Sequence, residues 1–505
     1  MTSLTESIWA HRALEVLPPT ILVLYYAVLG ILALYGLHRL ALVWSYRRHD
    51  ESEVVPPAPA EWPAVTVQLP LFNERYVAER LIEAVCALEY PRHRLEIQVL
   101  DDSVDETRHI VARKVEEMKG RGLDIVHLHR EDRHGYKAGA LAAGCAAAKG
   151  ELLAVFDADF VPPPSFLVDS VPYFTADPGL GMAQARWGHL NREQSLLTAV
   201  QAILLDGHFV VEHTARHRTG CLFNFNGTAG IWRRQAIRDA GGWDHDTLTE
   251  DLDLSYRAQL AGWRFHYLPD LVVPAELPAD INAYKSQQHR WAKGSIQTAR
   301  KLLGTVLGTT LPFRAKLEAF VHLTANASYL LMLLLSALIF PAMYLRRGED
   351  AWMLVAFDLP LFLAATVSVV VFFVHSQKRE GGIPAWRCLL RMPALMAVGI
   401  GLSVNNAQAV WNGLWQDGGV FHRTPKAGET KSKASPAVYR LRANLSFALE
   451  TTLALYFFIC FALAIHFQMW LSIPFLWLFL QGYVYMTWLG LQGSWHRRVA
   501  APQAA

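Results

Sequence analysis

The segment Leu152-Leu153-Ala154-Val155-Phe156-Asp157-Ala158-Asp159 joins a short apolar run to a pair of carboxylates. Its apolar part, 152–156, has the length and composition of a buried strand. The two aspartates therefore follow the end of that strand, where both can reach one hard cation such as Mg²⁺ or Mn²⁺. An Asp-x-Asp pair is also common in solvated turns, so this interpretation depends on what surrounds the segment.

Three more strands are predicted before this segment, at 65–69, 96–100 and 125–128, with helices at 79–88, 106–118 and 138–148. Strands that alternate with helices predict an α/β domain with a mostly parallel, Rossmann-like sheet. In such sheets ligands bind at the carboxyl ends of the strands. Asp101 and Asp102 follow the 96–100 strand, so both acidic clusters are expected at the same edge of the sheet.

Charged residues are distributed unevenly along the 505-residue chain, which is 52% hydrophobic and 18% charged. They are frequent from Glu51 to about Lys316, and long apolar runs follow. We therefore expect an N-terminal transmembrane helix within 1–50, a cytosolic domain at 51–316 that ends in interfacial helices, and a transmembrane domain at 317–505. The Arg47-Arg48 pair marks the cytosolic end of the first helix.

The apolar runs predict five spans, at 21–44, 319–345, 351–375, 447–467 and 470–491. The stretch 389–415 is apolar but interrupted by proline, glycine and asparagine, and we interpret it as an interfacial helix. This choice keeps the basic segments, including the one at 421–442, in the cytosol, as the positive-inside rule requires. A gating-type loop is expected at 416–442.

Net charge and cysteine content exclude some classes of protein. The net charge of +2 gives no broad basic field for nucleic acid. None of the five cysteines belongs to a Cys-x-x-Cys pair, so we expect neither a disulfide framework nor a zinc site.

Lys137 and the Asp101-Asp102 pair are candidates for binding a nucleotide diphosphate. Lys137 follows a glycine at a predicted helix N-terminus, a position that suits phosphate. One of the two aspartates could bind the base or ribose. The plain alternatives are an exposed lysine and acids that cap the following helix.

Two later motifs are candidates for catalysis and acceptor binding. Thr249-Glu250-Asp251 begins a predicted helix, and one of its acids could be a general base; alternatively the segment caps the helix and complements its dipole. In Gln287-Gln288-His289-Arg290-Trp291 the tryptophan offers a stacking face and the arginine a phosphate-binding fork. The alternative is an interfacial Trp-Arg anchor beside the membrane.

Taken in order, these motifs resemble the processive family-2 glycosyltransferases, which include cellulose synthases and plant mannan and glucomannan synthases. The resemblance runs from about Pro63 to Trp291 and rests on an ordered set of segments: 70–74, 101–103, 135–139, 157–159, 225–230, 249–251 and 287–291. Phe421–Lys426 partly matches the gating loop of cellulose synthases. The chain departs from those enzymes in having one predicted span before the catalytic domain, and its 135–141 and 225–230 segments are closer to plant mannan synthases. The donor is therefore open between UDP-glucose and GDP-mannose.

The resemblance implies a family-A type nucleotide-sugar-binding fold and an inverting, single-displacement transfer of a hexose. Asp251 would be the catalytic base. The donor would be bound by Asp101, Asp102, Lys137, Asp157 and Asp159, the last two holding Mg²⁺ or Mn²⁺. The diphosphate and acceptor would be bound by Gln287, Arg290, Trp291, Phe225, Asn226, Gly227, Thr228 and Glu250, and the gating loop would include Phe421, Thr424 and Lys426.

Three functions fit these features to different degrees. The first is a processive synthase that elongates a β-glycan, with coupled membrane translocation. The second is a glycolipid synthase of the ceramide glucosyltransferase type, and the third is a non-enzymatic export subunit, which the complete set of acids disfavours. Expected partners are a nucleotide-sugar donor, a glycan or lipid acceptor and membrane lipids, but no nucleic acid. The sequence does not indicate the oligomeric state, and its alanine- and arginine-rich character favours the bacterial inner membrane.

Overall fold

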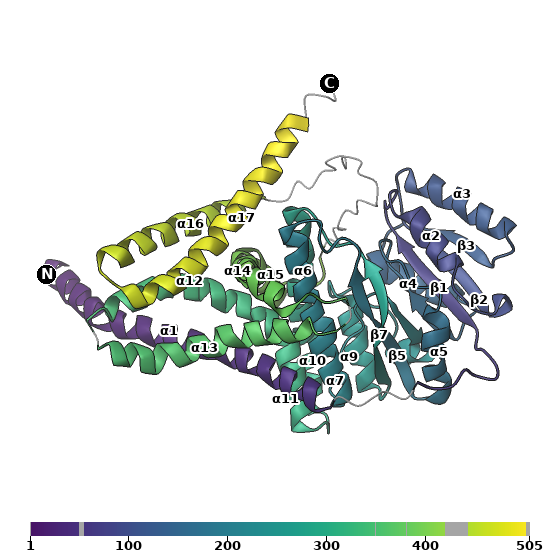
Figure 1. Cartoon of the computed structure of the whole chain (residues 1–505), viewed down its shortest axis with the longest axis horizontal. Coiled ribbons are helices and arrows are strands. Elements are labelled where there is room, and N and C mark those ends of the chain that lie inside the picture. The colour runs from purple at the N-terminus through teal and green to yellow at the C-terminus, as the bar shows by residue number, and fades with distance from the viewer. Residues whose placement is uncertain (1, 50–54, 349, 380, 420–442, 501–505) are drawn as a thin grey trace.

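The structure is a computed structural model that describes residues 2–49, 55–348, 350–379, 381–419 and 443–500. Figure 1 shows an elongated molecule with an α/β domain at one end and long helices at the other. The first helix, α1 (Thr2–Arg48), lies among the long helices, although it precedes the α/β domain in sequence.

A seven-stranded sheet in the order β3-β2-β1-β4-β6-β5-β7 forms the centre of the α/β domain. Strands β1 to β4 run parallel, β6 is antiparallel to both of its neighbours, and β5 pairs in parallel with β7. The carboxyl ends of β1, β2 and β4 therefore meet at one edge. The strands are β1 (Val65–Leu71), β2 (Leu95–Asp101), β3 (Ile125–His129), β4 (Leu152–Val155), β5 (Leu180–His189), β6 (Gly230–Arg233) and β7 (Arg264–Ala275).

Both faces of the sheet are covered by helices, so nearly all side chains of the central strands β1, β2 and β4 are buried. One face packs on α2 (Ala78–Cys86), α3 (Thr107–Gly120) and α5 (Phe166–Ala176), around residues such as Val67 and Val99. The other packs on α4 (Tyr136–Ala147), α8 (Arg234–Asp239) and α9 (Glu250–Leu260), around residues such as Leu153 and Trp232. A short 3-10 turn, η1 (Arg92–Arg94), precedes β2.

Two helical segments connect this domain to the long helices. The first is a continuous run of α6 (Leu196–Asp206), the π-helix η2 (Gly207–His213) and α7 (Thr214–Arg218), inserted between β5 and β6. The second follows β7 and contains α10 (Ile281–Gly308), α11 (Phe313–Thr324) and the short η3 (Ala325–Ala327). Asp280 caps α10 by accepting hydrogen bonds from the backbone N–H groups of Asn282 and Ala283.

The remaining helices form the bundle with α1. They are α12 (Ser328–Leu345), α13 (Ala351–Ser376), α14 (Ala385–Gly401), α15 (Ser403–Trp415), α16 (Ala443–His466), the short η4 (Trp470–Ser472) and α17 (Ile473–Ala500). Within the described residues, four helical segments are long and apolar enough to cross a membrane: 17–48, 313–345, 355–376 and 446–466. The pair α14 and α15 is bent by 42° and could be a fifth, broken span.

The predicted fold class is confirmed, because an α/β domain of the expected kind is joined to apolar helices. The four predicted strands are present with small differences at their ends, whereas β5, β6 and β7 were not predicted. The domain bounds, the number of spans and the interfacial interpretation of 389–415 stay predictions. In the described part of the chain, α17, which contains most of the predicted span 470–491, is not among the four span candidates.

Candidate active site

A pocket of about 180 Å³ lies at the edge of the sheet where β1 and β4 end. Its lining comes from many parts of the chain, including the ends of β1, β4, β5 and β7, the starts of α4 and α9, the turn before β6 and one face of α10. The pocket brings together most of the residues that the sequence singled out: Asp102, Lys137, Asp157, Asp159, Asn226, Gly227, Glu250, Asp251, Gln287, Arg290 and Trp291.

Asp157 is held at the end of β4 by two contacts, one from its backbone and one to its carboxylate. Its backbone N–H donates to the hydroxyl of Thr228 at 2.8 Å. The Lys137 ammonium donates to its carboxylate at 2.5 Å and to the Gly227 carbonyl at 2.8 Å. Lys137 is the second residue of α4, after Gly135 with φ +70°, a left-handed turn that favours glycine. The lysine therefore ties the Asp157 carboxylate to the turn that contains Gly227.

Glu250 and Asp251 bring two more carboxylates to the pocket, at the start of α9. Burial and, next, the charge of Glu250 raise the pKa of Asp251 to about 7, against the opposing effect of Lys137. Burial likewise raises the pKa of Glu250, although Lys137 opposes this. Asp251 is therefore the group in the pocket best suited to accept a proton near neutral pH.

Gly227 lies directly against the Asp251 carboxylate. A Cβ atom at Gly227 would be 2.9 Å from an oxygen of Asp251, and the residue has φ +81°. Both facts require glycine here. The turn before β6 therefore approaches the carboxylate closely enough to leave no room for a side chain.

The donor set suits a divalent cation. Asp157 and Asp159 both line the pocket, and Asp159 is almost fully buried. Lys137 interacts electrostatically with three carboxylates, those of Asp157, Glu250 and Asp251, so negative charge is in excess around it. Burial disfavours the Lys137 ammonium, but these carboxylates outweigh burial and raise its pKa. Carboxylate oxygens with surplus negative charge are the ligands that Mg²⁺ and Mn²⁺ prefer.

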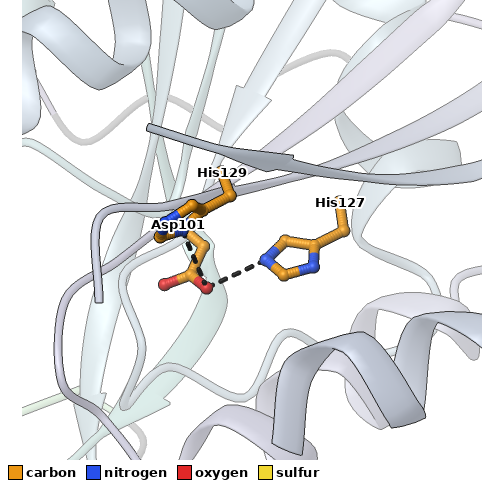
Figure 2. A group of neighbouring side chains, drawn as sticks. All are labelled: Asp101, His127 and His129. Atoms are coloured by element: carbon orange, nitrogen blue, oxygen red, sulfur yellow. Dashed lines mark hydrogen bonds and ion pairs between the residues drawn. The ribbon is translucent and has the colours of Figure 1, made fainter. Parts of the chain in front are cut away.

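The two aspartates at the end of β2, Asp101 and Asp102, face different ways. Asp102 lines the pocket and is held by the Arg130 guanidinium through two hydrogen bonds, at 2.8 and 2.6 Å. Asp101 does not line it: its carboxylate is fully buried, accepts from the Ser103 backbone N–H at 2.9 Å, and lies 2.9 Å from a ring nitrogen of His127 and 3.8 Å from one of His129 (Figure 2). Burial alone would raise the Asp101 pKa, but the hydrogen bonds from His127 and Ser103 lower it below its usual value. Of the pair, only Asp102 is placed to touch a donor in the pocket.

Gln287, Arg290 and Trp291 share one face of α10, at helical spacings of three and four residues. Gly294, one turn further on, lets α10 approach α9: a Cβ atom there would lie 2.5 Å from the Thr249 side chain. This close packing brings the α10 face to the same pocket as Glu250 and Asp251.

The other predicted acceptor residues are placed as follows. Asn226 lines the pocket, and its amide lies 2.9 Å from a ring nitrogen of His208 in the π-helix. Phe225 is fully buried in the core, and Thr228 is buried against Asp157 rather than lining the pocket.

The predicted gating-loop residues Phe421, Thr424 and Lys426 lie outside the described residues. The segment just before them is fixed to the catalytic domain, because the Gln297 side-chain amide donates to the carbonyls of Gln416 and Gly418, each at 2.8 Å.

The pocket also contains residues that the sequence-based site omitted, including Phe72, Arg133 and His189. The Arg133 guanidinium lies over the Phe72 ring at 3.5 Å. Phe72 belongs to the 70–74 segment, one of the motifs on which the resemblance rests. That motif could have indicated that Phe72 lines the site. His189 ends β5, a strand that was not predicted.

The chain matches the family described as "Glycosyltransferase like family 2" over residues 63–294. It is 45% identical to glucomannan 4-beta-mannosyltransferase 2 of Arabidopsis thaliana over 259 residues, which are 50% of this chain and 48% of that protein. It is 34% identical to glucomannan 4-beta-mannosyltransferase 7 of the same plant over 416 residues, which are 79% of this chain and 72% of that protein. The match thus spans about half the length of the first relative, 48%, and most of the second, 72%.

Among solved structures, a mannosyltransferase from Pyrobaculum calidifontis in complex with GDP-Man and Mn²⁺ has a similar fold. The TM-score is 0.53 at 21% identity, over 77% of this chain and 99% of that one. At this identity the likeness concerns the fold alone.

Proposed function

Because the chain belongs to glycosyltransferase family 2, in the cellulose synthase-like group that contains the plant glucomannan 4-beta-mannosyltransferases, we propose that it transfers mannose from GDP-mannose to the end of a growing β-glycan. The names of the relatives support mannose, and UDP-glucose is the competing donor. The same relatives favour a polysaccharide product over a glycolipid of the ceramide type.

The observation that carries this proposal is the position of Asp251 in the same pocket as Lys137 and the two β4 carboxylates. A single displacement needs a base for the acceptor hydroxyl on one side of the sugar and cationic groups for the leaving diphosphate on the other. Asp251, with its raised pKa, serves as the base. Lys137 and Arg290 bind the diphosphate, since both line the pocket and both are cations.

Asp157 and Asp159 are the residues that would hold Mg²⁺ or Mn²⁺. When bound, such a cation neutralises charge on the leaving diphosphate. The Mn²⁺ in the Pyrobaculum mannosyltransferase complex supports this cofactor. Asp102 would contact the nucleoside, and the Arg130 fork holds its carboxylate in one orientation.

The acceptor end of the glycan would lie against α10. Trp291 provides an apolar face on which a sugar ring can stack, and the Gln287 amide can hydrogen-bond sugar hydroxyls. Asn226 and Gly227 line the same pocket, and Gly227 lies against Asp251. This arrangement aligns a terminal sugar with the base, which is what transfer requires.

The helices that could cross a membrane support an integral membrane enzyme. The catalytic domain would lie on the cytosolic side, where nucleotide sugars are made, and the bacterial inner membrane is the proposed location. Coupled translocation of the product stays a prediction.

The test is a panel of donors, GDP-mannose, UDP-glucose and UDP-N-acetylglucosamine, given to detergent-solubilised full-length protein with Mn²⁺ and then with Mg²⁺. We expect nucleotide release from GDP-mannose in preference to the others. Asp251→Asn should lower kcat by about 10² to 10⁴-fold with little change in the KM of the donor, because the lost carboxylate acts on the acceptor.

Asp239→Asn is the matched control, because Asp239 is an exposed aspartate at the end of α8. It should release nucleotide at the wild-type rate. Wild-type release by Asp251→Asn, or no release from any donor, would contradict the proposed function.

A further inference from the structure

A second cavity, of about 720 Å³, lies between α1, α12, α13 and α14. These helices lie side by side in Figure 1, at the far side of the molecule from most of the sheet. Among the described residues, the cavity shares no lining residue with the catalytic pocket. Its volume is within the range of sites that bind small molecules.

The central wall of this cavity is apolar. The face that α12 turns to it carries Met332, Leu335, Ile339 and Met343, at the spacing of three to four residues expected for one side of a helix. Leu395 of α14 lines the cavity as well. A glycan would need hydrogen-bonding groups along such a wall, so its chemistry suits hydrocarbon.

Charged groups line the end of the cavity nearest the catalytic domain. Most of them are paired: Arg216 lies 3.3 Å from Glu212, which also lines the cavity. Arg216 and His38 lie 2.8 and 2.7 Å from Glu318 of α11, which is outside the lining. Arg39 differs. Its guanidinium lies over the Phe372 ring at 5.9 Å, and within the described residues it has no carboxylate partner.

Arg39 is also deep in α1, about 14 Å along the helix axis from Arg48 at its end. A cation at that depth is costly unless an anion or water compensates it. Its planar donors match a phosphate group in pairs.

At the opposite end of the cavity, Arg346 pairs with Asp358 at 2.5 Å, and Arg347 is exposed and stacks on the Tyr344 ring at 4.0 Å. Arg39 is half-buried, so its charge is the less accessible to water of the two cations that have no carboxylate partner among the described lining residues.

We propose that this cavity binds a membrane phospholipid, with its acyl chains along the apolar wall of α12 and α14 and its phosphate on Arg39. The lipid would join α1 to the helices that follow the catalytic domain. Because it binds the folded chain, it stabilises that fold by an amount that increases with the logarithm of its concentration over its Kd. This inference does not depend on which sugar the enzyme transfers.

Two glycines allow a matched test of the cavity. Gly399 of α14 lines it, and Gly30 of α1 does not; a Cβ atom at either position would meet no atom within 4 Å. Gly399→Leu therefore directs an apolar side chain into the cavity from a position whose Cβ is free of clashes, and Gly30→Leu makes the same exchange elsewhere in the bundle. Native mass spectrometry of the purified proteins should find a bound phospholipid on the wild type and on Gly30→Leu, and at least about fivefold less on Gly399→Leu. Equal lipid on both variants, no lipid on the wild type, or a carbohydrate in its place would overturn the proposal.

Arg39→Gln tests the phosphate contact. Adding phosphatidylglycerol to delipidated full-length protein should raise its Tm, and phosphatidylcholine, which has no net charge, should raise it less. In Arg39→Gln the preference for phosphatidylglycerol should disappear. An unchanged preference in this variant would overturn the assignment of Arg39.

Discussion

The proton on Asp251 is the residue-level feature on which the proposed chemistry depends. Asp251 lies in a buried pocket beside Glu250. Burial and the negative charge of Glu250 both disfavour the charged form of Asp251. Lys137 offsets part of this, which keeps the pKa near 7 instead of far above it. A carboxylate tuned in this way can accept a proton from a hydroxyl and release it again near neutral pH.

We predict that kcat/KM for the acceptor rises with pH up to about 7 and is level above it. A base acts in its deprotonated form, so activity is lost as pH falls through the raised pKa of Asp251, whereas the ordinary value of 3.8 would leave it level in this range. Initial rates between about pH 5 and pH 9 measure this profile.

Glu250→Gln removes the neighbouring negative charge and should move the midpoint of this profile to lower pH. A wild-type profile that is flat down to about pH 5 would contradict the assignment of Asp251 as the base.

Sequence motifs predicted the residues that line the pocket better than they predicted the partners of those residues. Asp102 and Lys137 were identified from strand and helix ends, which the chain encodes locally. The partners of the pocket residues are distant in sequence or depend on how the strands pair. Arg130 reaches Asp102 only because β3 lies beside β2. His208 reaches Asn226, another pocket residue, from a π-helix. Asp101 faces away from the pocket because of the same β2–β3 pairing, since its partners His127 and His129 lie on β3.

At the scale of elements, the first half of the sheet was predictable and the second half was not. Strands β1 and β2 alternate apolar with polar residues and β4 is a short apolar run, so each has a recognisable strand pattern. Strand β5 instead buries Gln184 and Arg186 and contains two glycines, so its sequence lacks the pattern of an apolar strand. It is held by its long pairing with β7, a contact that no local sequence pattern encodes.

The ion pair between Lys285 of α10 and Glu450 of α16 gives an element-scale prediction. The two groups are 2.7 Å apart and Glu450 is fully buried. Removing one partner leaves a buried charge uncompensated, so Glu450→Gln or Lys285→Met should each lower the free energy of unfolding by about 3 to 5 kcal/mol.

The double variant Lys285→Met/Glu450→Leu leaves no buried charge and should recover most of that loss. Thermal unfolding in detergent measures all of these proteins. If the double variant instead loses as much free energy of unfolding as the two single variants together, the Lys285–Glu450 pair is not what joins α10 to α16.

At the scale of the whole molecule, several contacts fix the catalytic domain to the helical bundle. Glu318 lies 2.8 Å from Arg216 of the catalytic domain and 2.7 Å from His38 of α1. Arg391 of α14 lies 2.7 Å from Glu193, which follows β5. The α10 face that would bind the acceptor is therefore held next to the helices that could cross the membrane, an arrangement that no single segment of the sequence reveals.

The most direct test of the account is the size and linkage of the product made from radiolabelled GDP-mannose by the purified full-length enzyme. The account predicts a product of high molecular weight that a β-mannanase digests to small oligosaccharides and that Asp251→Asn does not make. A small product that partitions into organic solvent and forms only when lipid is added would contradict it.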